Sequence, residues 1–323
     1  MNMDTPRKPR ALVTGGAGFI GSHLATRLRD EGWAVLVIDN LMSGHRHNVP
    51  VGVDFQWLDL TRDDAVLELP KDPVDVVFHL ASHVGQEISF DHPLYDFKAN
   101  GQSTVTLLNW CQRTGTNRMV FASSMNVYGE PVSLPVSEDA AIKPPSPYAV
   151  GKISSEYLCS IYEHFGIHST CLRLFNVYGP HQDMSNMLQG MMSIYMAFVA
   201  RGEPILVKGS MERFRDFVFV TDVVDAFYRC GTLEQAKGKV YNVATGRKTY
   251  VKDVIAGIVK AFGHDPATYP IIHGQPTRRD QFGIFGSAQK IKDELGWQPS
   301  TTLEEGLAQM AAWARDQRAA GKF

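Results

Sequence analysis

The sequence has few of the features that mark membrane, secreted or metal-stabilised proteins. Its 323 residues include only four cysteines, too widely spaced for a disulfide framework or a zinc site. We therefore expect Cys111, Cys159, Cys171 and Cys230 to be reduced thiols in the core. All apolar runs are shorter than the roughly 20 residues that cross a bilayer, so no transmembrane helix is predicted.

Neither sign of charge dominates the chain. Lys and Arg total 32 against 34 Asp and Glu, a formal net charge of −2, and there is no long basic segment. Nucleic acid is therefore not an expected partner. The polar N-terminal segment MNMDTPRKPR has no apolar signal core, which predicts a cytoplasmic protein. His45 and His47 lie close together but without a third ligand beside them, so no metal site is predicted.

Short β-branched runs alternate with longer helical periods in the first half of the chain. This alternation predicts an α/β fold with a doubly wound parallel sheet. The expected strands are 11–13, 34–38, 55–58, 74–79, 119–123 and 169–174, and the expected helices are about 18–31, 93–114 and 148–165.

Beyond residue 176 this rhythm loosens. A methionine-rich segment at 184–200 comes first, followed by the strand-like runs FRDFVFV and VYNVA and by helices near 250–263, 287–295 and 302–320. We expect one domain over residues 1–176, with returning segments at about 214–245. Residues 177–323 are expected to form a smaller C-terminal lobe.

A glycine-rich segment, TGGAGFIG, joins the first strand to its helix. Gly15, Gly18 and Gly21 permit a tight turn, a close approach to a pyrophosphate and packing of the helix on the strand. Asp39 ends the second strand 18 residues after Gly21, close to the ~20 at which a carboxylate binds ribose hydroxyls. The pattern predicts a Rossmann domain that prefers NAD, because a carboxylate repels the 2′-phosphate of NADP. Arg46 in the next loop leaves NADP as the alternative.

A second motif, PPSPYAVGKISSEY, predicts a helix capped by Ser146 with Pro147 in its first turn. Tyr148 and Lys152 then share one helical face. A free tyrosine has a pKa of about 10, too high for a base at neutral pH, but an adjacent ammonium group favours the phenolate. Ser124 leaves the end of the fifth strand, at the edge where open α/β sheets bind ligands. Each pattern alone is also typical of surface residues or capped turns.

Together these segments resemble the extended short-chain dehydrogenase/reductase family, and within it the NAD-dependent nucleotide-sugar 4-epimerases. The similarity spans nearly the whole chain and is carried by TGGAGFIGSHL, DNLMSGHRHNV, WLDL, HLAS, SSMNVYG, YAVGK, LRLFNVYGP, RDFVFVTDVVDA and DELGWQP. It implies epimerisation at carbon 4 of a nucleotide-diphosphate sugar, most simply a UDP-sugar, through a transient 4-keto sugar. It also implies a homodimer formed through helices 93–114 and 148–165, where Leu107, Leu108, Ile153, Leu158 and Ile161 are the apolar candidates.

The resemblance also assigns site residues, beginning with the catalytic set Ser124, Tyr148 and Lys152. The residues implied to bind NAD are Gly15, Gly18, Phe19, Ile20, Gly21, Asp39, Asn40, Ser43, Gly44, Asp59, Leu60, Leu80, Ala81, Ser82, Asn100, Ser123, Tyr148 and Lys152. Those implied to bind the sugar nucleotide are Ser124, Asn176, Lys208, Arg215 and Asp280, with Arg215 as a diphosphate clamp. The alternatives are an ion pair of Arg215 with Asp216 or Glu212, and a capped turn at Asn176.

Other residues bear on whether the enzyme catalyses 4-epimerisation or a related reaction. Met125 and Asn126 stand where similar 4,6-dehydratases carry an Asp–Glu pair, which argues against dehydration. A 4-keto-sugar reductase would use the same catalytic set and is the enzymatic alternative, and a non-catalytic NAD-binding sensor or scaffold is the alternative of another class. Thr277 stands where the family usually has arginine, so Arg278 and Arg279 are the candidates to replace it.

Overall fold

The computed structural model describes residues 7–83, 86–187, 190–275 and 281–323, and this chain divides into two compact units. The first unit contains the chain through residue 123, residues 146–172 and residues 224–240; the second contains residues 124–145, 173–223 and 241–323. Compared with the boundaries expected from the sequence, residues 124–145 group with the second unit and the returning segment is shorter. Within the described chain, every helix is too short or too polar to span a bilayer.

A seven-stranded sheet forms the centre of the fold, in the order β11-β6-β5-β4-β1-β2-β3. The strands are β1 (Arg10–Thr14), β2 (Ala34–Asp39), β3 (Asp54–Trp57), β4 (Val76–His79), β5 (Arg118–Ser124), β6 (His168–Leu174) and β11 (Val240–Val243). β1 pairs in parallel with both β2 and β4, and the strand order changes direction between them. Such a reversal creates a crevice for ligands at the carboxyl ends of the strands. The predicted doubly wound parallel sheet is confirmed.

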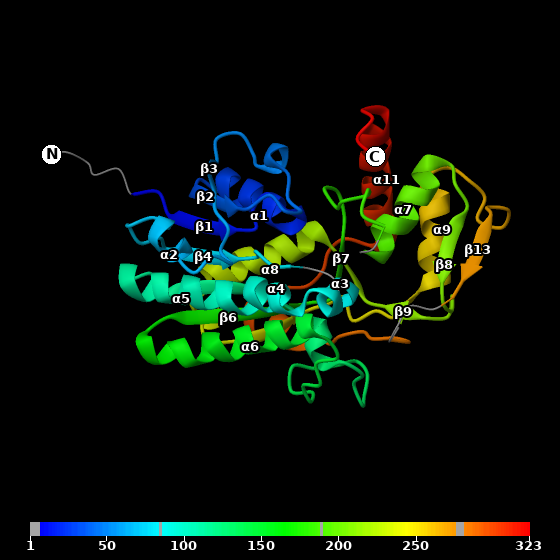
Figure 1. Cartoon of the computed structure of the whole chain (residues 1–323). Coiled ribbons are helices and arrows are strands. Elements are labelled where there is room, and N and C mark those ends of the chain that lie inside the picture. Colours follow the sequence, from blue (N-terminus) through cyan, green and yellow to red (C-terminus); the bar gives the residue numbers. More distant parts are fainter. Residues whose placement is uncertain (1–6, 84–85, 188–189, 276–280) are drawn as a thin grey trace. The chain divides into compact units, whose positions relative to one another are not determined.

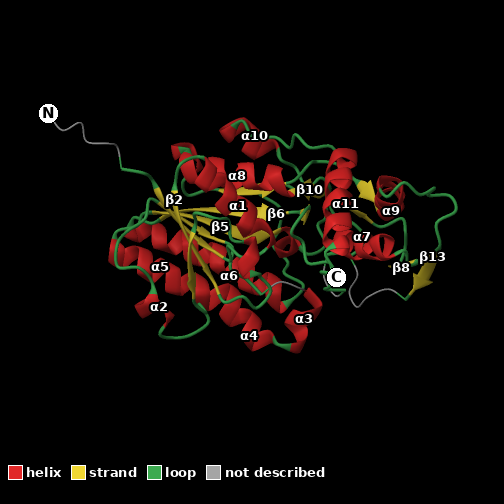
Figure 2. Cartoon of the chain, turned by 90° about the horizontal axis from the view of Figure 1, so that it is seen from above, coloured by secondary structure: helices red, strands yellow, loops and turns green. Residues whose placement is uncertain are grey.

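Helices cover both faces of this sheet (Figure 2). On one face lie α1 (Phe19–Asp30) and α8 (Val220–Thr232), and on the other lie α5 (Ser103–Thr114) and α6 (Pro147–Tyr162). The first unit also holds the short helices α2 (Ala65–Glu68), α3 (Gln86–Asp91) and α4 (Pro93–Phe97). Leu107, Leu108, Trp110 and Phe121 are fully buried between the sheet and its helices. The four cysteines are free and buried, as predicted.

Helix ends follow the capping signals in the sequence. Ser146 accepts a hydrogen bond from the amide of Ala149 at 3.3 Å, with Pro147 in the first turn of α6. The helix predicted over 93–114 is present, and a π-helical segment at Lys98–Gln102 joins its two α-helical parts, α4 and α5. The hydroxyl groups of Ser103 and Thr104 bond to carbonyl groups four residues earlier, which favours local distortion of a helix.

The second unit is built around three helices that pack on one another, α7 (Met191–Arg201), α9 (Val251–Ala261) and α11 (Leu303–Ala319) (Figure 1). Its other elements are β7 (Asn176–Tyr178), β8 (Ile205–Lys208), β9 (Phe214–Arg215), β10 (Phe217–Phe219), β12 (Thr249–Tyr250), β13 (Ile271–Gly274) and α10 (Gln289–Leu295). Met184, Met192 and Met196 of the methionine-rich segment are buried, as expected of flexible side chains that fill core gaps.

The predicted FRDFVFV strand is two short strands. Asp216 lies between β9 and β10 and is fully buried. Its carboxylate accepts hydrogen bonds from the backbone amides of Thr245, Gly246 and Gly286 and from the hydroxyl of Thr245. A buried carboxylate needs such donors, because burial otherwise destabilises its charge. The strand is therefore interrupted at Asp216, whose carboxylate bonds to amides of other segments.

Candidate active site

The glycine-rich turn between β1 and α1 closes tightly on its surroundings. Gly15 has φ +70°, and a Cβ placed there would lie 2.6 Å from the amide nitrogen of Ala81. A Cβ on Gly21 would lie 2.2 Å from the carbonyl oxygen of Gly15. Gly18 is the N-cap of α1 and has no side chain that could cap the first amides of this helix. Uncapped amides at a helix N-terminus after a glycine turn suit a pyrophosphate.

Asp39 connects this turn to the end of β2. Its carboxylate accepts hydrogen bonds from the amides of Ala17 (3.0 Å) and Leu41 (2.8 Å). Burial raises the pKa of Asp39, and the two amide hydrogen bonds act against that shift. A Cβ on Gly44 would lie 2.8 Å from the carbonyl carbon of Ala17, so the loop that includes Asn40 and Ser43 packs closely on the turn.

The carboxyl ends of β3 and β4 complete this side of the first unit. Asp59 accepts hydrogen bonds from the amide and hydroxyl of Thr61 just after β3, and Leu60 is buried. After β4, the hydroxyl of Ser82 donates to Oδ1 of Asn100 at 2.6 Å, and Nδ2 of Asn100 donates to the carbonyl oxygen of His83. The structure therefore ties the predicted cofactor residues at the ends of β1 and β2 to one another, and those after β4 to Asn100.

Tyr148 and Lys152 lie on the same face of α6, as predicted. Tyr148 is 7% exposed and Lys152 is 2% exposed, and Nζ of Lys152 lies 5.7 Å from the centre of the Tyr148 ring. The same Nζ donates a hydrogen bond to the carbonyl oxygen of Ala122 in β5 at 2.9 Å. An ammonium group this close favours the ionised form of a phenol.

The surroundings of Lys152 contain acidic groups that the sequence analysis did not identify. Burial lowers the pKa of Lys152 to about 7, and the carboxylates of Asp96 and Glu156 act against that shift. Asp96 is fully buried, with one oxygen 3.1 Å from Nδ1 of His83 and the other without a hydrogen-bond partner. The spacing of four between Lys152 and Glu156 is the signal that could have identified Glu156. Asp96 has no such signal, because it lies on another helix.

The lowered pKa of Lys152 predicts a pH-dependent stability. Between about pH 7 and the ordinary lysine pKa of about 10.4, the unfolded chain binds a proton that the folded chain does not, so stability rises with pH. In nucleotide-free protein, we expect the free energy of unfolding of the wild type, relative to that of Lys152→Met, to rise by about 2 kcal/mol from pH 7 to pH 9. Urea unfolding at the two pH values measures it, and an unchanged difference would mean that Lys152 titrates normally.

Ser124 opens the second unit at the end of β5. Its side-chain oxygen accepts a hydrogen bond from the amide of Asn126 at 3.2 Å and so caps the short 3₁₀ helix Met125–Tyr128. The hydroxyl of Tyr128 donates to Asn242 at 2.6 Å and accepts from Arg173 at 2.9 Å. This buried network holds the segment that follows Ser124, because each of its polar groups has a partner.

Two of the predicted substrate residues are buried or half-buried in the second unit. Arg215 donates hydrogen bonds to the carbonyl oxygens of Phe214, Gln281 and Phe282. Nδ2 of Asn176 donates to the carbonyl oxygen of Asp216 at 3.1 Å. Of the two alternative partners of Arg215, Asp216 accepts hydrogen bonds from backbone amides and Glu212 pairs with Lys252 at 2.9 Å.

The other two substrate residues are less constrained by the structure. Lys208 ends β8 with an exposed side chain, opposite Gly274 of β13. Asp280 lies outside the described residues, and so do Thr277, Arg278 and Arg279. Gln281, a hydrogen-bond partner of Arg215, directly follows that segment in the chain.

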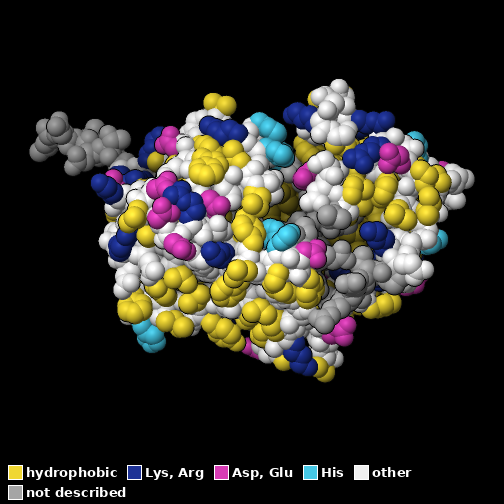
Figure 3. All heavy atoms as spheres, viewed as in Figure 1, with side chains coloured by type: hydrophobic (Ala, Val, Ile, Leu, Met, Phe, Trp, Pro, Cys, Tyr) yellow, Lys and Arg dark blue, Asp and Glu magenta, His cyan; other side chains and the backbone are white. Residues whose placement is uncertain are grey.

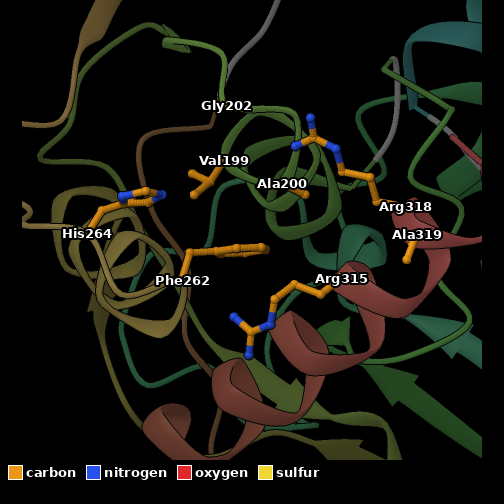
Figure 4. Close-up of a pocket in the computed structure, with 8 residues that line it drawn as sticks. All are labelled: Val199, Ala200, Gly202, Phe262, His264, Arg315, Arg318 and Ala319. Carbon is orange, nitrogen blue, oxygen red and sulfur yellow. The ribbon is translucent and has the colours of Figure 1, made fainter.

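A separate hollow of about 500 Å³ lies within the second unit, where α7, α9 and α11 end (Figure 4). It is lined by Val199, Ala200, Gly202, Phe262, His264, Arg315, Arg318 and Ala319. Arg315 donates to the carbonyl oxygen of Ala261 at 3.1 Å and stacks beside the ring of Phe262. Cations stabilise the carboxyl ends of helices, so Arg315 is explained by capping of α9. None of the predicted site residues lines this hollow.

Comparison with known proteins agrees with this geometry. Residues 11–244 match the NAD dependent epimerase/dehydratase family. A UDP-glucose 4-epimerase from Mycolicibacterium smegmatis is 34% identical over 317 residues, covering 95% of this chain and 99% of that protein. The crystal structure of UDP-glucose 4-epimerase from Thermotoga maritima with UDP-glucose has a TM-score of 0.90 and 33% identity, covering 96% of this chain and 99% of that one. The UDP-glucose 4-epimerase of Thermus thermophilus in complex with NAD has a TM-score of 0.86 and 32% identity, covering 95% of this chain and 99% of that one. The chain therefore belongs to the NAD dependent epimerase/dehydratase family of enzymes, and NAD is its cofactor.

Proposed function

We propose that this enzyme inverts carbon 4 of a nucleotide-diphosphate sugar, and that its substrate is a UDP-sugar. The observation that carries this proposal is the buried pair on α6, in which Nζ of Lys152 lies 5.7 Å from the ring centre of Tyr148. The names of the similar proteins support the substrate class. Ser124 at the end of β5 supplies the third polar group of the catalytic set.

The first unit has the residues to hold the cofactor. The glycine turn packs α1 closely on the end of β1, because side chains at Gly15 and Gly21 would collide with backbone atoms. The N-terminus of α1 would then bind the pyrophosphate. Asp39, at the end of β2, would bind the hydroxyl groups of the adenosine ribose. When bound, NAD would supply a reversible acceptor for the hydride of carbon 4, so that this carbon can be inverted without net redox change.

Side chains of this protein transfer the proton of the sugar hydroxyl and stabilise the phenolate. Tyr148, as phenolate, removes the proton of the sugar hydroxyl and later returns it to the same oxygen, so no net proton is consumed. Lys152 stabilises the phenolate through its ammonium charge. Ser124 donates a hydrogen bond to the reacting oxygen and so stabilises the 4-keto sugar.

The second unit is proposed to hold the nucleotide while the keto sugar rotates to present its opposite face. Arg215 would bind the diphosphate and Asn176 would support it, with Lys208 and Asp280 on the nucleoside side. Binding the non-reacting nucleotide tightly keeps the substrate in the site while the sugar reorients. Met125 and Asn126 carry no carboxylate, so the segment after Ser124 lacks the acid and base that elimination of water needs.

The test is turnover with a panel of sugars. Purified protein with NAD⁺ is mixed with UDP-, dTDP-, GDP- or CDP-sugars, and the 4-epimer is detected by chromatography. We expect conversion of a UDP-sugar without net consumption of NAD⁺. No conversion of any sugar would refute the epimerase and favour a sensor or scaffold. Conversion of 4-keto sugars only when reduced cofactor is added would favour the reductase.

Cofactor preference tests the role of Asp39. Because its buried carboxylate would repel a 2′-phosphate, we expect Asp39→Ala to narrow the preference for NAD over NADP by roughly tenfold or more. Dissociation constants of both nucleotides, measured by calorimetry, give the ratio. Asp54→Ala, an exposed residue of β3, is the control that should leave it unchanged. An unaltered ratio in Asp39→Ala would remove Asp39 from this role.

We also propose that the enzyme is a cytoplasmic homodimer. The buried free thiols suit a reducing compartment. Of the apolar residues expected at a helical interface, Leu107, Leu108 and Ile153 are buried within the first unit and pack in its core. Ile161 is 53% exposed, and Tyr157, one turn earlier on α6, is 61% exposed.

Further exposed apolar residues extend this face. Leu94 and Phe97 of α4 and Val150 of α6 are exposed, and α4 packs against α6. Figure 3 shows hydrophobic side chains gathered on the lower left of the view, over α5 and α6. A contiguous exposed apolar surface is typical of a protein contact. We expect Ile161→Glu to convert a dimer into a monomer in light scattering, whereas a wild type with the mass of one chain would refute the dimer.

A further inference from the structure

Two side chains of α6 bind two consecutive residues of β5. Nζ of Lys152 donates to the carbonyl oxygen of Ala122 at 2.9 Å, and the hydroxyl of Ser123 donates to Oε1 of Glu156. Lys152 and Glu156 are one helical turn apart and lie on the same face of α6. Lys152, Glu156 and Ser123 are all buried. These contacts join the helix that carries Tyr148 to the strand end that precedes Ser124.

Ser124 is the next residue of the same strand. Ser123 bonds to Glu156 of α6, and Ser124 is the last residue of β5. Ser124 in turn caps the 3₁₀ helix that begins at Met125. Fixing the side chain of Ser123 therefore fixes the backbone from which the hydroxyl of Ser124 projects.

Glu156 also places a negative charge near the ammonium group of Lys152. The titratable groups around Lys152 are Tyr148 and Glu156 on α6, Asp96 on α4 and His79 on β4. Burial lowers the pKa of His79 to about 3, so His79 is neutral and leaves the two carboxylates to offset the charge of Lys152. Buried charges are tolerated when opposite charges and hydrogen bonds accompany them.

We propose that Glu156 is a positioning residue for the reaction, which holds the end of β5 through Ser123 and favours the charged form of Lys152. This proposal rests on the proposed epimerase function. Two hydrogen bonds, one from the Ser123 hydroxyl to the Glu156 carboxylate and one from Lys152 to the carbonyl oxygen of Ala122, join α6 to β5. Glu156 itself acts through Ser123 and Lys152.

Two substitutions separate the bond from the charge. Glu156→Gln keeps the size of the side chain and an oxygen that can accept from Ser123, but removes the negative charge. Ser123→Ala removes the donor and keeps the charge. Glu163→Gln, the same chemical change seven residues later and outside α6, is the matched control. Each variant is assayed for kcat, KM and the NAD content of the folded protein.

We expect Glu156→Gln to lower kcat at least about tenfold, with KM changed less than about threefold and the NAD content retained. The alkaline limit of kcat should move to lower pH, because loss of the negative charge favours neutral Lys152. Ser123→Ala should lower kcat without moving that limit. The double variant should lose less than the product of the two single losses, because both act on one contact. Activity per NAD-loaded molecule equal to that of Glu163→Gln would overturn the proposal.

A second measurement does not depend on turnover. In NAD-loaded protein with ¹³C-labelled lysine, the NMR signal of Lys152 is assigned from its absence in Lys152→Met and titrated with pH. We expect its midpoint to fall by at least about half a pH unit in Glu156→Gln and to stay in place in Glu163→Gln. An unchanged midpoint would overturn the proposal even in a protein with normal activity. A wild type that converts no sugar would refute the proposed function, while this titration would still decide whether Glu156 controls Lys152.

Discussion

Replacing Tyr148 by phenylalanine is expected to lower kcat for epimerisation by about a thousandfold or more, while the protein keeps its NAD. The substitution removes only the hydroxyl group and retains a buried ring that lies 5.7 Å from Nζ of Lys152. Without that hydroxyl, no phenolate is available to take the proton of the sugar. The measurement is kcat with a saturating UDP-sugar, together with the nucleotide released after denaturation.

A matched control exists on the same helix. Tyr162 ends α6 and donates its hydroxyl to Asn109 at 2.6 Å. Tyr162→Phe therefore removes a bonded hydroxyl of equal size away from the catalytic turn, and its kcat should stay within about twofold of the wild type. If Tyr148→Phe retained more than about a tenth of the wild-type kcat, another group would have to be the base.

Replacing Gly21 by alanine should weaken NAD binding by on the order of 100-fold. The added Cβ would lie 2.2 Å from the carbonyl oxygen of Gly15 and 2.8 Å from the Cα of Gly16. These neighbours are backbone atoms of the turn itself, so α1 must move away from the turn. Its first amides would then no longer point at the pyrophosphate. Calorimetric titration of NAD measures the effect.

Gly32→Ala separates this effect from a general loss of stability. Gly32 has φ +84°, so alanine is strained there, but its Cβ would meet nothing within 4 Å. We expect this control to cost about 1 kcal/mol of stability and to leave the affinity for NAD unchanged. Normal NAD affinity in Gly21→Ala would mean that the turn after β1 does not hold the pyrophosphate.

The features predicted correctly from the sequence are those that depend on residues close in the chain. The glycine turn needs a spacing of a few residues between a strand and a helix, and Gly15 has the positive φ that such a turn requires. Ser146 and Pro147 define the start of α6, which places Tyr148 and Lys152 on one face. Helical and strand periodicity likewise predicted the alternation of strands and helices in the first half of the chain.

Local pattern did not predict the details that residues distant in the sequence decide. The helix expected at 93–114 contains a π-helical segment, in which Asn100 bonds to the backbone of His83 and to the hydroxyl of Ser82. The FRDFVFV strand breaks at Asp216, because that buried carboxylate takes its hydrogen bonds from the Thr245–Gly246 turn. Neither partner can be identified from periodicity, since each lies more than 15 residues away in the sequence.

By itself, then, the sequence determined the fold class, the cofactor turn and the Tyr148–Lys152 pair, because these follow from spacing within one or two elements. The tertiary structure decided how deeply Lys152 is buried and which acids surround it. Asp96 lies on α4 and Glu156 one turn beyond Lys152 on α6, and both affect the same ammonium group. A charge in a low-dielectric interior is controlled by every group nearby in space, whatever its distance along the chain.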